Sequence, residues 1–151
     1  MTMSGKSIEI KRQLKAGQDR VFAAFADKAA FSQWFKPGPH IELKVIAFEF
    51  RKGGNLQLEF GEDGSEKMVM RGEFVQVHPN SKLAFTWTWD APHTDSGSLT
   101  LVEVSIAARG DFADLTVIHS KLPSSEARDR YMQGWTGCLD LLETTINLQN
   151  A

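Results

Sequence analysis

The sequence contains little cysteine, no long apolar run and no excess of basic charge. Its single cysteine, Cys138, cannot form an intrachain disulfide, and such scarcity is typical of a reducing compartment, so we expect a cytoplasmic protein. No apolar run approaches the roughly 20 residues that span a bilayer, and the polar residues 1–7 do not resemble a signal peptide. A formal net charge of −2 without a basic stripe argues against a nucleic-acid partner.

The patterns that indicate a metal centre or familiar catalysis are also missing. The single cysteine cannot complete a thiolate site, and no two histidines stand at i, i+4 spacing among His40, His78, His93 and His119. There is no Gly-x-Ser-x-Gly elbow, and Gly53-Gly54 lacks the length and following helix of a phosphate loop. Asp111 and Asp114 flank a predicted turn, which favours a role in the turn over acid–base chemistry. We therefore expect no metal, no cofactor and no catalytic residue.

What is present is an ordinary globular composition with clear periodicity. At 42% hydrophobic and 24% charged residues, the 151-residue chain fits one domain over residues 1–151. Alternating or apolar runs between turn residues predict strands at 7–14, 41–50, 55–60, 68–77, 83–89, 99–107 and 112–120. Helical spacing predicts two short helices within residues 18–35 and one long helix from about residue 124 to residue 148.

This order of elements predicts an α+β fold. Short turns between neighbouring strands favour an antiparallel meander, and a sheet with one apolar face must cover it. Only the C-terminal helix is long enough to do so, and it carries an apolar stripe made of Tyr131, Trp135, Cys138, Leu139, Leu142 and Ile146. We expect a curved antiparallel sheet of about seven strands wrapped round this helix, with the stripe against Phe85 and Trp87.

Two features of the predicted interior have two interpretations each. Gly134 and Gly137 lie inside the long helix, where each costs about 1 kcal/mol relative to alanine. They allow either close packing of helix on sheet or extra space beside Trp135. His119 shares its parity with Leu115 and Val117 and should point inward. It is either a buried histidine satisfied by a backbone or hydroxyl partner, or a polar anchor for a ligand.

Large aromatic side chains converge on the same interior from strand 83–89 and from the long helix. They fill a core, or they leave an apolar cavity, which is the usual form of a small-molecule site. The second interpretation predicts a cavity entered near the loop of residues 90–97. Its predicted ligand-binding residues are Met70, Trp87, Trp89, His119, Tyr131, Gly134, Trp135 and Cys138.

Four stretches of the chain resemble a known superfamily. They are residues 34–37 (Trp-Phe-Lys-Pro), 48–54 (Phe-Glu-Phe-Arg-Lys-Gly-Gly), 71–89 and 119–139. In order and spacing they are similar to the SRPBCC or START-like helix-grip superfamily, and most of all to the branch named after the C-terminal domain of the activator of heat-shock protein 90 ATPase. The resemblance covers nearly the whole chain. It implies a helix-grip fold. It also implies one of the functions found in that superfamily, which includes lipid carriers, aromatic polyketide cyclases, hormone receptors and chaperone activators.

The predicted function is binding of an apolar small molecule, lipid-like or aromatic, between sheet and helix. One alternative is a protein-interaction module whose partner is a chaperone or another protein. The additional N-terminal domain of the eukaryotic activator has no counterpart here, which weighs against chaperone activation. A second alternative is a cyclase- or hydrolase-like enzyme that uses His119 or a carboxylate in the pocket. The sequence leaves the ligand and the oligomeric state open.

Overall fold

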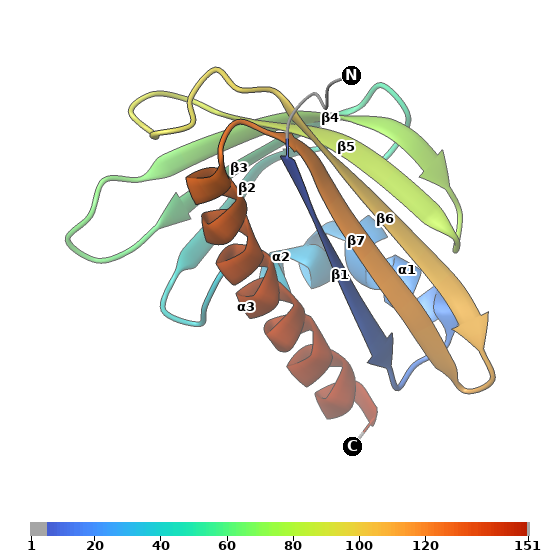
Figure 1. Cartoon of the computed structure of the whole chain (residues 1–151). Coiled ribbons are helices and arrows are strands. Elements are labelled where there is room, and N and C mark those ends of the chain that lie inside the picture. Colours follow the sequence, from blue (N-terminus) through green and yellow to red (C-terminus); the bar gives the residue numbers. More distant parts are fainter. Residues whose placement is uncertain (1–5, 151) are drawn as a thin grey trace, which may run out of the picture.

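The computed structural model describes residues 6–150, with side chains described up to Leu148, and its elements follow the predicted order (Figure 1). Strand β1 (Lys6–Leu14) precedes helices α1 (Gln18–Ala26) and α2 (Lys28–Trp34). The other six strands are β2 (Glu42–Phe48), β3 (Asn55–Gly61), β4 (Met68–His78), β5 (Lys82–Trp89), β6 (Thr100–Arg109) and β7 (Phe112–Leu122). Helix α3 (Ser125–Asn150) follows them.

All seven strands form one antiparallel sheet in the order β1-β7-β6-β5-β4-β3-β2. Consecutive strands from β2 to β7 are neighbours, as in a meander, and β1 joins the far edge by pairing with β7. Figure 1 shows the sheet curving round α3, with α1 and α2 on the chain between the two edge strands. The predicted α+β helix-grip fold is therefore confirmed.

The helices begin where side chains can accept their free backbone N–H groups. Ser124 Oγ accepts from the backbone N–H of Ala127 at 3.0 Å, so Ser124 is the N-cap of α3, as predicted. Asp27 Oδ1 accepts from Ala29 N–H at 2.9 Å, which ends α1 and starts α2 at the same residue. The break at Asp27 turns the second short helix toward β2 and α3.

The apolar stripe of α3 packs on the concave face of the sheet. All six of its residues are buried, and the Trp87 ring centroid lies 5.9 Å from that of Tyr131 and 6.2 Å from that of Trp135. Phe85, two residues before Trp87 on β5, is also buried and stacks on it. The predicted contact between the stripe and β5 is confirmed.

Gly137 allows a close approach, but not to the sheet. A Cβ on this residue would lie 1.9 Å from the carbonyl oxygen of Pro37. Close packing at Gly137 was therefore predicted correctly, but its partner is Pro37 in the loop after α2 and not the sheet. This contact fixes residues 35–41 against the helix, where they form one wall of the site.

Candidate functional site

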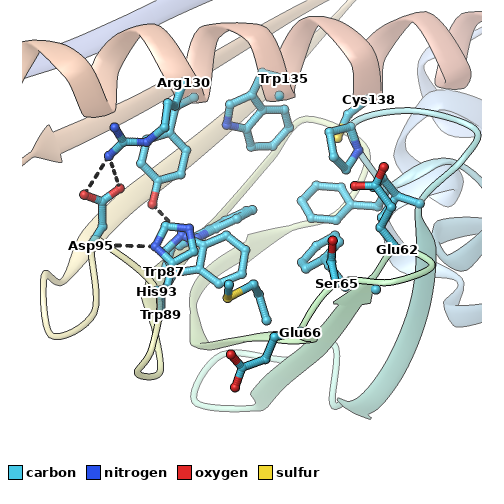
Figure 2. Close-up of a pocket in the computed structure, with 18 residues that line it drawn as sticks. Glu62, Ser65, Glu66, Trp87, Trp89, His93, Asp95, Arg130, Trp135 and Cys138 are labelled. Atoms are coloured by element: carbon cyan, nitrogen blue, oxygen red, sulfur yellow. Dashed lines mark hydrogen bonds and ion pairs between the residues drawn. The ribbon is translucent and has the colours of Figure 1, made fainter.

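A cavity of about 380 Å³ lies between α3, the loop after α2, and the ends of β3, β4 and β5 (Figure 2). Its inner walls are apolar and mostly aromatic, and its outer edge is formed by two loops, residues 61–67 and 90–97. Six of the eight predicted ligand-binding residues line it, namely Trp87, Trp89, Tyr131, Gly134, Trp135 and Cys138. Loop 90–97, beside which the sequence predicts the entrance, contributes His93 and Asp95 to the lining.

Met70 and His119 do not line the cavity, so the predicted lining is wrong at these two residues. Both side chains are fully buried, at 0% exposure. Met70 lies opposite Trp89 in the sheet, but the cavity begins nearer the β3–β4 loop, so Met68, one pleat further out, lines it instead. His119 is covered by the rings of Tyr131 and Trp135.

The contacts of His119 show why it is buried. Trp135 Nε1 donates to His119 Nδ1 at 3.0 Å, and Thr100 Oγ1 lies 2.7 Å from His119 Nε2. Since the Thr100 hydroxyl donates its proton to the Trp87 carbonyl at 2.9 Å, it accepts from His119 Nε2–H. The ring is thus a neutral Nε2–H tautomer with both nitrogens satisfied, and burial lowers its pKa to about 3. This is the hydroxyl-satisfied buried histidine, not a ligand anchor.

The long helix contributes one open position to the cavity. Apart from its chain neighbours and the backbone of its own helix, no described atom lies within 4 Å of where a Cβ of Gly134 would be, and this residue lines the cavity. Cys138, one turn further along, is buried, and burial raises the pKa of its thiol. Cys138 therefore acts as a small apolar wall residue rather than as a nucleophile.

Loop 90–97 is tied to α3 by a chain of polar contacts that the sequence did not predict. Trp89 Nε1 donates to the Tyr131 hydroxyl at 2.8 Å, and the His93 ring stacks on Trp89 with a centroid distance of 4.3 Å. Asp95 N–H donates to His93 Nδ1 at 2.9 Å. Arg130 Nη2 donates to both oxygens of Asp95, at 2.9 and 2.8 Å (Figure 2). These contacts hold the outer loop against the helix at the entrance.

Burial changes the acid–base behaviour of this chain of contacts. It raises the pKa of Tyr131 to about 12 and lowers that of His93, so both are neutral near pH 7. Asp95 is 7% exposed and forms an ion pair with the Arg130 guanidinium. This edge of the cavity therefore contains one ion pair, Asp95 with Arg130, and two neutral polar rings, those of Tyr131 and His93.

We expect Arg130→Gln to loosen loop 90–97, because it leaves the buried Asp95 carboxylate without its cation. Removing one partner of a buried charged hydrogen bond costs about 1–3 kcal/mol, and the partial exposure of Arg130 favours the lower end. Amide hydrogen exchange should accelerate about tenfold at residues 95–98. Arg128→Gln, the same charge change on an exposed neighbour, is the control. Equal exchange in both variants would show that the ion pair does not hold the loop.

Neither a metal centre nor a membrane-spanning helix is found in the described part of the chain. No group of three or more His, Cys, Asp or Glu side chains among residues 6–148 could hold a metal ion. Over the same described range, no helix is long and apolar enough to cross a membrane.

The curved sheet, the long gripped helix and the cavity between them define the START-like helix-grip class of proteins. The chain belongs to the family described as "Activator of Hsp90 ATPase homolog 1-like protein", whose pattern matches residues 15–147. Folds of this family commonly bind hydrophobic ligands. No curated protein matches the chain in sequence.

Solved structures share the fold over almost the full chain. The AHSA1 protein of Silicibacter pomeroyi is 22% identical, with a TM-score of 0.85 over 95% of this chain and 99% of its own. Protein CV1439 of Chromobacterium violaceum is also 22% identical, with a TM-score of 0.83 over 93% and 97% of the two chains. The Mll3558 protein of Rhizobium loti is 26% identical, with a TM-score of 0.73 over 93% and 96%.

Proposed function

We propose that this chain binds an apolar small molecule, lipid-like or aromatic, in the cavity between the sheet and α3. The observation that supports this most directly is the open space beside Gly134. A glycine inside a helix costs about 1 kcal/mol relative to alanine, and a helix that only filled a core would gain from a larger side chain there. The missing side chain instead leaves space that belongs to the cavity.

The walls supply the driving force for such a ligand. Phe35, Phe60, Trp87 and Trp135 line the cavity, and burying apolar ligand surface against them is favourable by about 25 cal/mol per Å² before the costs of binding are subtracted. The volume of about 380 Å³ lies within the usual range for small-molecule pockets. The family's common use of hydrophobic ligands supports the same function.

The alternatives have less support. An enzyme needs buried polar groups directed at its substrate. The Asp95 carboxylate is bonded to Arg130, and His119 is satisfied outside the lining. The other two carboxylates of the lining, Glu62 and Glu66, are exposed at its outer edge. A protein-interaction module needs a continuous apolar patch, whereas the large exposed apolar side chains come from β2, β4, the β5–β6 loop, β7 and two distant points of α3. A chaperone partner and a cytoplasmic location stay predictions.

We expect the substitution Gly134→Leu to fill the cavity and weaken probe binding at least about tenfold, because the added side chain takes the space of the ligand. The test titrates N-phenyl-1-naphthylamine, a neutral fluorescent probe, and follows its emission and that of tryptophan. Gln133→Leu is the matched control, since it adds the same side chain at an exposed neighbouring position.

Circular dichroism and thermal unfolding establish that both variants are folded before their affinities are compared. Leucine is a good helix former, so Gly134→Leu should keep the helix. If the folded Gly134→Leu variant binds the probe as tightly as Gln133→Leu does, the cavity is not the binding site. The protein-interaction alternative would then be favoured.

A further inference from the structure

One residue that lines the cavity has a buried hydrogen-bond donor without a partner. The chain has four tryptophans, and three donate their indole N–H: Trp34 to Ala24 O at 3.0 Å, Trp89 to Tyr131 at 2.8 Å, and Trp135 to His119 at 3.0 Å. Trp87, which lines the cavity and is 6% exposed, does not. Among the buried side-chain nitrogens and oxygens of the described residues, Trp87 Nε1 alone has no partner. Buried donors are normally satisfied, so this one favours a ligand that brings an acceptor.

The outer edge of the cavity is negatively charged. Its lining includes the carboxylates of Glu62, Glu66 and Asp95 but only one cation, Arg130, which is bonded to Asp95 (Figure 2). Its formal charge is therefore −2 with His93 neutral. Two basic side chains beyond the lining, Lys67 and His40, face carboxylates at 3.6 and 3.7 Å. A carboxylate or phosphate on the ligand would meet repulsion and no free cation in the described lining.

The walls between these two ends are aromatic rings set at an angle to each other, tilted in one pair and edge to face in another. The Phe60 and Trp89 centroids are 5.7 Å apart, and those of Phe35 and Trp135 are 5.4 Å apart with an interplanar angle of 78°. Ring edges and faces arranged in this way pack well on another planar aromatic ring. The space left open by Gly134 lies beside the same walls.

We propose that the ligand is a planar aromatic molecule, neutral or cationic, with an uncharged carbonyl or ether oxygen at the end that enters first. Trp87 Nε1–H, which is buried in the ligand-free chain, donates to this oxygen once the ring has shifted enough to expose the nitrogen to the cavity. The acidic edge excludes carboxylates, sulfonates and phosphates. The inference rests on the proposed binding function and names the chemistry of the ligand. It also gives the ligand one orientation, with the oxygen inward and the neutral or basic end at the entrance.

Three naphthalenes of matched shape test both halves of the inference. They are 2-acetylnaphthalene, which carries a carbonyl oxygen, 2-isopropenylnaphthalene, which replaces that oxygen by a methylene, and 2-naphthoate, which carries a carboxylate. Their affinities are measured by displacement of N-phenyl-1-naphthylamine at pH 8, where an ordinary histidine is neutral. The ketone should bind about fivefold more tightly than the alkene and at least about tenfold more tightly than the carboxylate.

Two variants assign these differences to residues. Trp87→Phe removes the donor and should bring the affinities of ketone and alkene within about twofold. Glu62→Gln with Glu66→Gln should tighten naphthoate binding about two- to fivefold and leave the ketone unchanged. The control double variant, Glu9→Gln with Glu73→Gln, makes the same charge change at exposed positions outside the lining and should change none of the three affinities.

The outcomes separate the inference from the function on which it rests. If alkene or naphthoate binds the native protein as tightly as the ketone does, the inference is wrong, although the cavity still binds aromatic molecules. If N-phenyl-1-naphthylamine itself does not bind, the proposed function fails. Should Trp87→Phe not fold, the ligand series on the native protein and the glutamate variants still decide the inference.

Discussion

Replacing Gly137 by alanine should lower the free energy of unfolding by about 1–3 kcal/mol, although alanine is the better helix former. The added Cβ would lie 1.9 Å from the Pro37 carbonyl oxygen and 2.7 Å from its carbon. Both are backbone atoms, so no side chain can rotate away, and either α3 or the loop after α2 must move. For a domain of this size the loss corresponds to a Tm lower by about 2–12 °C.

Gly134→Ala is the matched control, since it makes the same change three residues away on the same helix. No described atom outside the adjoining backbone of its own helix and its chain neighbours stands within 4 Å of the added Cβ, so only helix propensity changes. We expect stability to rise by about 0.5–1 kcal/mol. Differential scanning calorimetry of both variants measures the two opposite shifts. If Gly137→Ala is as stable as Gly134→Ala, the helix and the loop are not in the close contact described.

The displaced loop should also affect the cavity. Phe35, Pro37 and Ile41 form one of its walls, and their position depends on the contact between Pro37 and Gly137. A folded Gly137→Ala variant should therefore bind N-phenyl-1-naphthylamine more weakly than Gly134→Ala does. Glycine thus has two different roles on α3: Gly137 allows close contact with the loop after α2, and Gly134 leaves space in the cavity.

The two glycines illustrate what the sequence could not predict. They lie three residues apart, about 60° round the helix, so periodicity places both on nearly the same face. Their surroundings differ because Gly137 meets a loop and Gly134 meets a cavity. The sequence around a helical glycine does not indicate which loop packs against the helix at that position. Pro37 itself was recognisable only as the residue that stops the second short helix.

The strands and the long helix could be predicted because each buries one face. Alternation along β5 correctly places Leu83, Phe85 and Trp87 inside, and helical spacing correctly places Tyr131 and Trp135 opposite them. The convergence of these aromatic rings was therefore predictable, and with it six of the cavity residues. At β4 the predicted lining residue was Met70, whereas Met68, two residues away on the same face, lines the cavity. Alternation shows which face of the sheet a residue lies on, but not how far along the strand the cavity begins.

The polar contacts at the entrance were unpredictable for a different reason. Asp95 and Arg130 are 35 residues apart, one in a polar loop and the other in the charged second turn of a helix. Such residues are usually solvated, and a long-range ion pair leaves no periodic signal. The unpaired indole of Trp87 could not be predicted either, since the three other tryptophans find acceptors that only the folded chain brings near.

Because of His119, the free energy of unfolding should decrease as the pH falls below about 6.5. In the folded chain burial lowers its pKa to about 3, whereas in the unfolded chain it stays near 6.5. Between these values the unfolded state binds a proton that the folded state does not, so stability falls as the pH falls. The loss is about 1.4 kcal/mol per pH unit below 6.5, while stability above 6.5 is unaffected by this group.

The contacts of His119 explain why its protonation is unfavourable in the folded state. A proton on Nδ1 would face the N–H that Trp135 Nε1 donates, and the pair would lose its hydrogen bond inside the core. Chemical denaturation at pH values from 5 to 7.5 measures the slope of the unfolding free energy. His119→Gln, although less stable throughout, should show a slope smaller by about one proton, whereas the exposed His78→Gln should keep the native slope. If the unfolding free energy of His119→Gln had the same pH slope as that of the native protein, His119 would be taking up its proton in the folded native protein. The neutral Nε2–H tautomer between Thr100 and Trp135 would then be wrong.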